Sequence, residues 1–340
     1  MANHEKEIEQ CIIRRKDMQA CKTAFIDART PGSDKKENFC LIGGGVAENP
    51  DQIVHIDTPH GFNIGAAKQP NGCKNSHHSH DTEEVFMVHS GEWKFTWGEN
   101  GTDGSVILSP GDVISLPVNM FRGFENVGQD DAMLYAILGL NDDGTAGRVT
   151  WAPYVFDNAK EHGLVLLEDG RLIDTAAGQQ VPEDASQVIP TTLEEAAKID
   201  TYSVDEMIAN VYRKDTVTGE IKGGLNVHPG VREIPLIGSA NPNEDLEDAY
   251  INRHHRFHLR LLQLESDAQV PTHQRFEEEV IIVQSGEVSI DIDSYCTVLH
   301  KGDLVTVPVN AKRSLKNNGQ EPSELFFVRR GNYPKAPNYM

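Results

Sequence analysis

Residues 72–91 read GCKNSHHSHDTEEVFMVHSG and hold four of the chain's 14 histidines together with the apolar run VFMV. Part of this stretch occurs again further along the chain, where residues 273–287 match residues 78–92 at 8 of 15 positions. Residues 111–128 are repeated in the same way at 302–319, with 8 of 18 positions identical. Two matching blocks in the same order indicate a duplicated domain.

The chain is 340 residues long, a length that suits two domains. The repeat places these two domains and leaves three other segments. We expect an N-terminal arm at 1–36, a first repeated domain at 37–140, a connector at 141–231, a second repeated domain at 232–332 and a C-terminal tail at 333–340.

The hydrophobic pattern within each repeat is typical of β-strands. Trp93, Phe95 and Trp97 alternate with polar residues, which places three large aromatic side chains on one face of a strand. Residues 288–292 show the same period of two in the second repeat, and turns containing glycine or proline separate the short segments. This spacing predicts a mainly β fold, built as small sandwiches or barrels.

The connector has a different pattern, in which helix-starting signals replace the alternation. Thr192 is followed three residues later by Glu195, and Ser203 is followed in the same way by Glu206. Each pair is a capping box, which predicts the start of a short helix. A third helix is expected within residues 151–162. The connector should therefore be partly helical.

The charge of the chain excludes some partners. Lysine and arginine total 31 and aspartate and glutamate total 52, so the net charge is −21. A surface this acidic repels phosphate backbones, and we expect no nucleic-acid partner. No apolar run has the length of a membrane helix, and the first residues lack the pattern of a signal peptide. Because the five cysteines are scattered without a CxxC pair, we expect a cytoplasmic protein with no membrane partner.

The histidines suggest a metal site. His78 and His80 are two residues apart, so on a strand they share a face, and Glu84 can join them if the chain continues or turns back. Two imidazoles and one carboxylate form the facial set that holds ions such as Fe(II) or Mn(II) and leaves coordination positions open. His77 and His89 lie an odd number of residues away, and we expect them at the surface or at an interface.

The spacing Gly72-x5-His78-x-His80-x3-Glu84-x6-Gly91 resembles the first sequence motif of the cupin superfamily at every fixed position. The resemblance extends to the second repeat, so the chain is similar to a bicupin. This resemblance implies two jelly-roll β-barrels joined by the partly helical connector. It also implies that each barrel has a place where cupins can hold a metal ion. It does not imply one reaction, because cupins include dioxygenases, decarboxylases, isomerases, lyases and seed storage proteins.

The second cupin motif is matched at residues 111–126, with two departures. Asn119 stands where the motif has glycine, and asparagine tolerates the left-handed conformation of such a turn. Arg122 stands where the motif supplies a fourth ligand, histidine, and a guanidinium cannot ligate a metal. Two roles for Arg122 are open: it anchors an anionic substrate beside a metal ion, or it pairs with Glu84 and no metal binds.

The second repeat departs further from the metal-binding pattern. The positions that correspond to the three ligands and to Arg122 hold His273, Arg275, Glu279 and Arg313. With one imidazole left, we expect no metal there, and we expect the two arginines to neutralise Glu279. His258 and Arg260 share a strand face and could extend this group into an anion pocket, although structural ion pairs are the favoured interpretation. The acidic stretch at 243–248 is expected to be a solvated loop.

The leading functional hypothesis is a metal-dependent enzyme with one working site, in the first barrel. Three protein ligands leave positions for a chelating substrate and for O2, which favours a dioxygenase that uses Fe(II), with Mn, Ni or Zn as other candidates. The substrate would be a small anionic organic acid, anchored by Arg122 and partly enclosed by Phe86 and Phe124. Glu84 and Arg122 are the expected catalytic residues.

Two other functions are open. The metal could act as a Lewis acid, with Glu84 or water as the base, in an isomerase or lyase for a keto or hydroxy acid. The chain could instead be a non-catalytic cupin that binds an acidic metabolite. In each case we expect a homo-oligomer, a dimer or higher, because barrels that expose sheet faces commonly pair.

Overall fold

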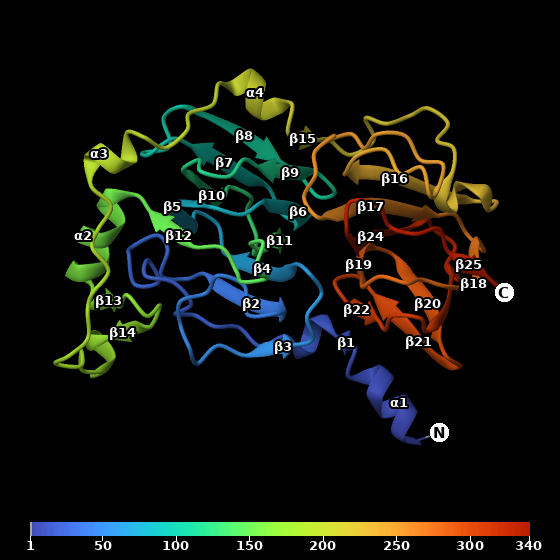
Figure 1. Cartoon of the computed structure of the whole chain (residues 1–340), viewed down its shortest axis with the longest axis horizontal. Coiled ribbons are helices and arrows are strands. Elements are labelled where there is room, and N and C mark those ends of the chain that lie inside the picture. The colour runs from blue at the N-terminus through green and yellow to red at the C-terminus, as the bar shows by residue number, and fades with distance from the viewer. Residues whose placement is uncertain (1) are drawn as a thin grey trace. The chain divides into compact units, whose positions relative to one another are not determined.

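The computed structural model describes residues 2–340, which form two compact units (Figure 1). One unit, called here the N-terminal barrel, is made of Gln19–Asp57 and Asn63–Arg213. The other, the C-terminal barrel, is made of three segments: the chain up to Met18, Thr58–Phe62 and Lys214–Met340. Each unit therefore includes segments that lie outside the two sequence repeats.

Short strands make up the N-terminal barrel. In chain order they are β2 (Glu37–Ile42), β3 (Val54–Ile56), β4 (Asn63–Gln69), β5 (Lys74–His80), β6 (Glu84–Ser90), β7 (Trp93–Trp97), β8 (Gly104–Leu108), β9 (Val113–Leu116), β10 (Arg122–Asn126), β11 (Ala132–Leu138), β12 (Val149–Trp151) and β15 (Val211–Tyr212). One sheet has the order β15-β9-β6-β11-β4-β2-β3 and the other β12-β5-β10-β7-β8. Their neighbouring strands are antiparallel, apart from the parallel pair β2 and β3.

Strand β7 shows how the sequence pattern produces this barrel. Trp93, Phe95 and Trp97 are at most 1% exposed, whereas the two residues between them are partly exposed. The ring of Phe95 lies 5.3 Å from that of Phe86 and 5.8 Å from that of Phe124, measured between centroids. The alternation predicted from the sequence is confirmed, and its apolar face forms the core of the barrel.

The segment between the repeats contains short helices, as predicted. They are α2 (Pro153–Glu161), α3 (Leu193–Ala196) and α4 (Val204–Ile208). Both capping boxes are present, because Thr192 accepts the backbone N–H of Glu195 and Ser203 accepts that of Glu206. A hairpin of β13 (Leu164–Leu166) and β14 (Leu172–Asp174) and the 3-10 turn η2 (Thr175–Ala177) lie between α2 and α3. No helix in residues 2–340 is long and apolar enough to cross a membrane.

The C-terminal barrel repeats the two-sheet plan. Its elements are α1 (Ala2–Glu9), β1 (Ile12–Ile13), η1 (Arg15–Asp17), η3 (Gly224–Val227), β16 (Val231–Ile237), β17 (Phe257–Leu264), β18 (Gln269–Gln274), β19 (Glu279–Ser285), β20 (Glu287–Ile292), β21 (Tyr295–His300), β22 (Leu304–Val307), β23 (Lys312–Lys316), β24 (Ser323–Arg330) and β25 (Asn338–Tyr339). The sheets have the orders β1-β22-β19-β24-β17-β16 and β21-β20-β23-β18-β25. Strands from both ends of the chain therefore complete this barrel.

The barrels share one feature that lies outside the matching blocks of sequence. Strand β12 pairs with β5 and places Trp151 opposite His78. Strand β25 pairs with β18 and places Tyr339 opposite His273. Although β12 follows the first repeat and β25 belongs to the C-terminal tail, each puts an aromatic residue beside the residue at the first histidine position of the motif, His78 or His273.

Two sequence predictions about polar residues are wrong. His89, expected at the surface or at an interface, is fully buried against the ring of Tyr135 within its own barrel, because residues on both faces of β6 are buried. Glu244 lies in the stretch expected to be a solvated loop, yet it is only 6% exposed because it pairs with two buried arginines. His77, by contrast, is partly exposed.

The turns that precede β10 and β23 generate a stability prediction. Asn119 and Asn310 hold equivalent positions with φ of 54° and 64°, so the left-handed conformation predicted for Asn119 is confirmed. Asn310 is exposed. We expect Asn310→Ala to lower the free energy of unfolding by about 1 kcal/mol, because a Cβ disfavours this conformation, and we expect Asn310→Gly to be tolerated. Urea unfolding followed by circular dichroism measures both, and an alanine variant as stable as the glycine variant would contradict the strain.

Candidate metal centre

Two imidazoles are held side by side at the end of β5. His78 and His80 are 4% and 2% exposed, and their ring centres lie 5.0 Å apart. The Nδ1 atom of His78 lies 2.8 Å from the carbonyl oxygen of Ser76, and that of His80 lies 3.2 Å from the carbonyl oxygen of Arg148. A carbonyl only accepts hydrogen bonds, so each Nδ1 carries the proton and each Nε2 presents a lone pair. This is the tautomer in which Nε2 ligates a metal.

Glu84, the first residue of β6, completes a group of three donors. One donor atom from each of His78, His80 and Glu84 lies within 4.8 Å of the others, and His80 Nε2 is 3.6 Å from Glu84 Oε1. Ligand atoms stand about 2.0–2.2 Å from a bound zinc-like ion, so a small closing movement would bring all three onto one divalent ion. The structure therefore brings together the three residues predicted as ligands, and they fit a metal ion.

Burial and charge set the protonation of these donors. The pKa values of His78 and His80 are held well below their usual range, first by burial and then by the Arg122 guanidinium, so both rings are neutral. Burial raises the pKa of Glu84, and Arg122 opposes that rise. A divalent ion at this place would favour the ionised carboxylate, because metal binding displaces protons from its ligands.

Arg122 pairs with Glu84 in a way that leaves one carboxylate oxygen for a metal. The guanidinium is fully buried and donates through Nε and Nη2, at 3.1 and 2.9 Å, and both bonds go to Oε2. Its Nη1 donates to the carbonyl oxygen of Met120 at 3.1 Å. The other carboxylate oxygen, Oε1, lies beside His80. Of the two roles open for Arg122, the structure shows the ion pair, and this pair is compatible with a metal ion.

A cavity of about 80 Å³ opens onto the three donors. Its walls are mostly apolar and include Phe86 and Phe124, the two residues expected to enclose a substrate. Arg122 does not line this cavity. The structure therefore gives no support to Arg122 as a substrate anchor or as a residue that touches the reacting atoms, because its donors are used by Glu84 and Met120. Arg122 is instead a positioning residue, which orients a metal ligand.

Motif spacing did not reveal the other residues around the cavity. Phe25 and Phe39 line it from segments that precede the first motif. Trp151, from β12, also lines it and packs against the His78 ring with centroids 5.2 Å apart. These side chains come from distant parts of the sequence, and no local pattern connects them to the motif.

A buried polar network also supports His78. Lys36 and Asp27 form an ion pair, and each is at most 1% exposed. Lys36 donates to the side-chain oxygen of Asn75 at 2.8 Å, and Asp27 accepts the backbone N–H of Ser76 at 3.0 Å. Because the Ser76 carbonyl binds Nδ1 of His78, this network fixes the orientation of one ligand.

The corresponding residues of the C-terminal barrel also converge, but the carboxylate at their centre, Glu279, is already paired with arginines. Glu279 accepts from Arg329 Nε at 2.6 Å, and the same oxygen lies 3.3 Å from Arg275 Nε. Its other oxygen is 4.0 Å from Arg313 Nη1. The predicted pairing of Arg275 with Glu279 is confirmed, whereas Arg329 was not predicted. His273 adds one buried imidazole to this group.

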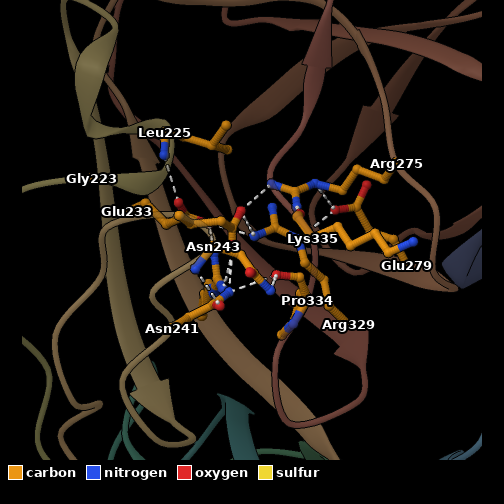
Figure 2. A network of polar contacts seen from close by, with 12 residues as sticks. Gly223, Leu225, Glu233, Asn241, Asn243, Arg275, Glu279, Arg329, Pro334 and Lys335 are labelled. Carbon is orange, nitrogen blue, oxygen red and sulfur yellow. Dashed lines mark hydrogen bonds and ion pairs between the residues drawn. The ribbon is translucent and has the colours of Figure 1, made fainter.

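Two further carboxylates extend this group into a network (Figure 2). Glu233 accepts from Arg260 at 3.1 Å and from Arg329 at 2.7 Å. Glu244 accepts from Arg260 and, at 2.9 Å, from Arg275. Arg260 therefore serves in structural ion pairs, the interpretation that the sequence favoured.

The ligand set predicts the response of metal binding to single substitutions. His78→Ala and His80→Ala should each lower the affinity for a divalent ion by at least about 100-fold, because each removes one of three ligands; loss of an outer-shell partner alone typically costs 10–100-fold. Mass spectrometry after anaerobic loading and desalting measures the bound metal. His273→Ala, the matched change in the other barrel, should leave the metal content unchanged. Equal metal content in His78→Ala and the unmodified chain would contradict this assignment.

The C-terminal network predicts a pH-dependent contribution to stability. Burial raises the pKa of Glu279, but Arg329, Arg313 and Arg275 outweigh burial and bring it to about 2, below the ordinary 4.5. The stabilisation is therefore fully present above pH 4.5 and is lost as pH falls toward 2. Glu279→Gln should lower the free energy of unfolding by about 3–5 kcal/mol at pH 7, and urea unfolding should show this difference shrinking between pH 4.5 and 2. A difference that does not change with pH would contradict the ion pairing.

Residues 67–138 and 260–329 each match the family model of the cupin domain, and each match contains the central residues of one barrel. The formate complex of Lactobacillus farciminis oxalate decarboxylase has a similar fold, with a TM-score of 0.55 and 11% identity over 95% of this chain and 87% of that one. So do vicilin from Capsicum annuum (TM-score 0.57, 11% identity, 97% and 88% covered) and the 7S globulin of Momordica charantia (0.54, 14%, 93% and 83%). These identities show the fold alone, and no curated protein matches the sequence. The chain carries two cupin domains and is a bicupin.

Proposed function

We propose that the N-terminal barrel is the active site of a metal-dependent dioxygenase that acts on a small organic acid, with Fe(II) as the favoured ion. The observation that carries the proposal is the convergence of three buried donors, from His78, His80 and Glu84, at a cavity with mostly apolar walls. Bound Fe(II) would supply open coordination positions for both a chelating acid and O2.

Charge counting supports an anionic substrate. The imidazoles of His78 and His80 are neutral, and the charges of Glu84 and Arg122 cancel. A divalent ion would therefore bring an uncompensated double positive charge into a buried site, which is costly unless an anion accompanies it. A chelating carboxylate supplies that anion. On this argument the acid binds through the metal, and Arg122 contributes by holding Glu84.

The cavity walls support an acid with a short apolar substituent. Phe86 and Phe124 are 3% and 6% exposed, and their ring centres are 5.0 Å apart. Phe39 lines the cavity as well, so its walls offer few hydrogen-bonding groups apart from the three metal donors. A heavily hydroxylated substrate would leave its hydroxyl groups unpaired there.

The isomerase or lyase alternative uses the same donors with Mn, Ni or Zn. It needs a base, and Glu84 suits that role poorly because Oε2 is bonded to Arg122 and Oε1 faces the metal position. A non-catalytic cupin that binds an acidic metabolite would use the same charge balance. The fold shared with seed globulins is consistent with this second alternative but does not favour it over catalysis.

Oxygen consumption distinguishes these functions. The anaerobic Fe(II)-loaded chain is mixed with a panel of small keto, hydroxy and dicarboxylic acids, and O2 uptake is measured with product identification. We expect uptake coupled to the loss of an acid, abolished in His80→Ala and retained in His273→Ala. Turnover under strict anaerobiosis would contradict the proposal and identify an isomerase or lyase. Binding of an acid without turnover with Fe, Mn, Ni or Zn would identify a non-catalytic cupin.

A further inference from the structure

One polar network of the C-terminal barrel is built around buried arginines. Four arginines, each at most 1% exposed, lie in one network: Arg260, Arg275, Arg313 and Arg329. The network has three buried carboxylates, those of Glu233, Glu244 and Glu279. Four positive charges against three negative charges leave one positive charge over. Glu277, whose side chain is 11% exposed, is a fourth carboxylate at the edge of the network and accepts from Arg275 at 3.3 Å, so it offsets part of this charge.

Arg313 is the member of this network that lacks a close carboxylate. Its Nη2 donates to the carbonyl oxygen of Pro308 at 3.1 Å. Its Nε and Nη1 are buried and have no hydrogen-bond acceptor among the described residues. Glu279 stays 4.0 Å from Nη1, while Arg329 binds Glu279 at 2.6 Å. A buried guanidinium with two unsatisfied nitrogen atoms calls for an acceptor that the chain itself does not supply.

The other barrel provides an internal comparison. Arg122 holds the equivalent position, and its three nitrogen atoms all donate, two to Glu84 and one to a carbonyl. The unsatisfied groups of Arg313 therefore do not follow from the fold. The unsatisfied groups arise because Arg275 replaces the second histidine ligand and Arg329 is also present. Both arginines pair with Glu279, so Arg313 has no close carboxylate.

We propose that the C-terminal barrel binds a small monovalent anion, a halide or a short carboxylate, against Arg313 Nη1 and beside Glu279 and His273. The anion supplies the missing acceptor and places a negative charge beside a guanidinium that has no carboxylate within hydrogen-bond distance. The neighbouring guanidinium groups add to the positive potential at this place. One of them, Arg275, also has an Nε atom without a hydrogen-bond acceptor. Arginine is suited to this task because it stays charged when buried.

The C-terminal tail limits the size of the anion. Strand β25 pairs with β18, and the Tyr339 ring lies 5.7 Å from that of His273. The Tyr339 hydroxyl is 2.8 Å from His228 Nε2, and the Lys335 carbonyl accepts from Arg275 at 3.1 Å. Figure 2 shows Pro334 and Lys335 beside the arginines of the network. These contacts bring the tail close to Arg275 and His273 and leave room for a small anion only.

Thermal unfolding of the full-length chain tests the proposal with sodium bromide and sodium acetate as probes, at constant ionic strength. Either probe should raise the melting temperature of the unmodified chain along a saturating curve, by roughly 2–4 °C. Arg313→Met removes the guanidinium and should abolish the saturating rise, while Arg313→Lys should retain part of it. General salt effects on unfolding cancel in the comparison of variants.

Crystals soaked in bromide give a second readout that needs no variant. Anomalous diffraction should show a bromide peak in contact with Arg313 Nη1. Bromide found only on the surface, with the same thermal response in Arg313→Met and the unmodified chain, would overturn the proposal and mean that water satisfies the guanidinium. If Arg313→Met does not fold, the presence or absence of the peak decides. Neither readout depends on metal binding in the N-terminal barrel.

Discussion

One carboxylate in each barrel, and the number of arginines bonded to it, determines what that barrel can bind. Glu84 receives both of its arginine bonds on Oε2, so Oε1 stays beside His80 for a metal ion. Glu279 is shared by Arg329 and Arg275, with Arg313 left 4.0 Å away. A buried carboxylate that is already neutralised by two cations is a poor metal ligand. The equivalent position thus leaves a free carboxylate oxygen beside two histidines in one barrel and an arginine without a close carboxylate in the other.

The sequence predicted the part of this account that depends on local spacing. The alternation around Trp93, the capping boxes, and the shared face of His78 and His80 each involve residues a few positions apart, where strand and helix periodicity is enough. The partners of those residues come from distant segments, and spacing carries no information about them. Glu244 is the clearest example, because its acidic neighbours in sequence indicate a solvated loop, while Arg260 of β17 and Arg275, which follows β18, hold its side chain inside.

Edge strands complete both barrels with segments that are not repeated. Trp151 on β12 and Tyr339 on β25 lie opposite His78 and His273, and each ring packs against its histidine. The two segments have different sequences and different distances from their motifs, so comparison of the repeats could not align them. An aromatic edge residue beside the histidine is therefore common to both barrels, although Trp151 is buried and Tyr339 is 40% exposed, and the charges around the two histidines differ.

Metal binding is expected in the N-terminal barrel alone. Anomalous diffraction above the absorption edge of iron, from crystals grown anaerobically with Fe(II), locates a bound ion directly. The account predicts one peak, within ligand distance of His78 Nε2, His80 Nε2 and Glu84 Oε1, and no iron peak beside His273 and Glu279. Absence of a peak at the first site, or a peak of equal height at the second, would contradict it.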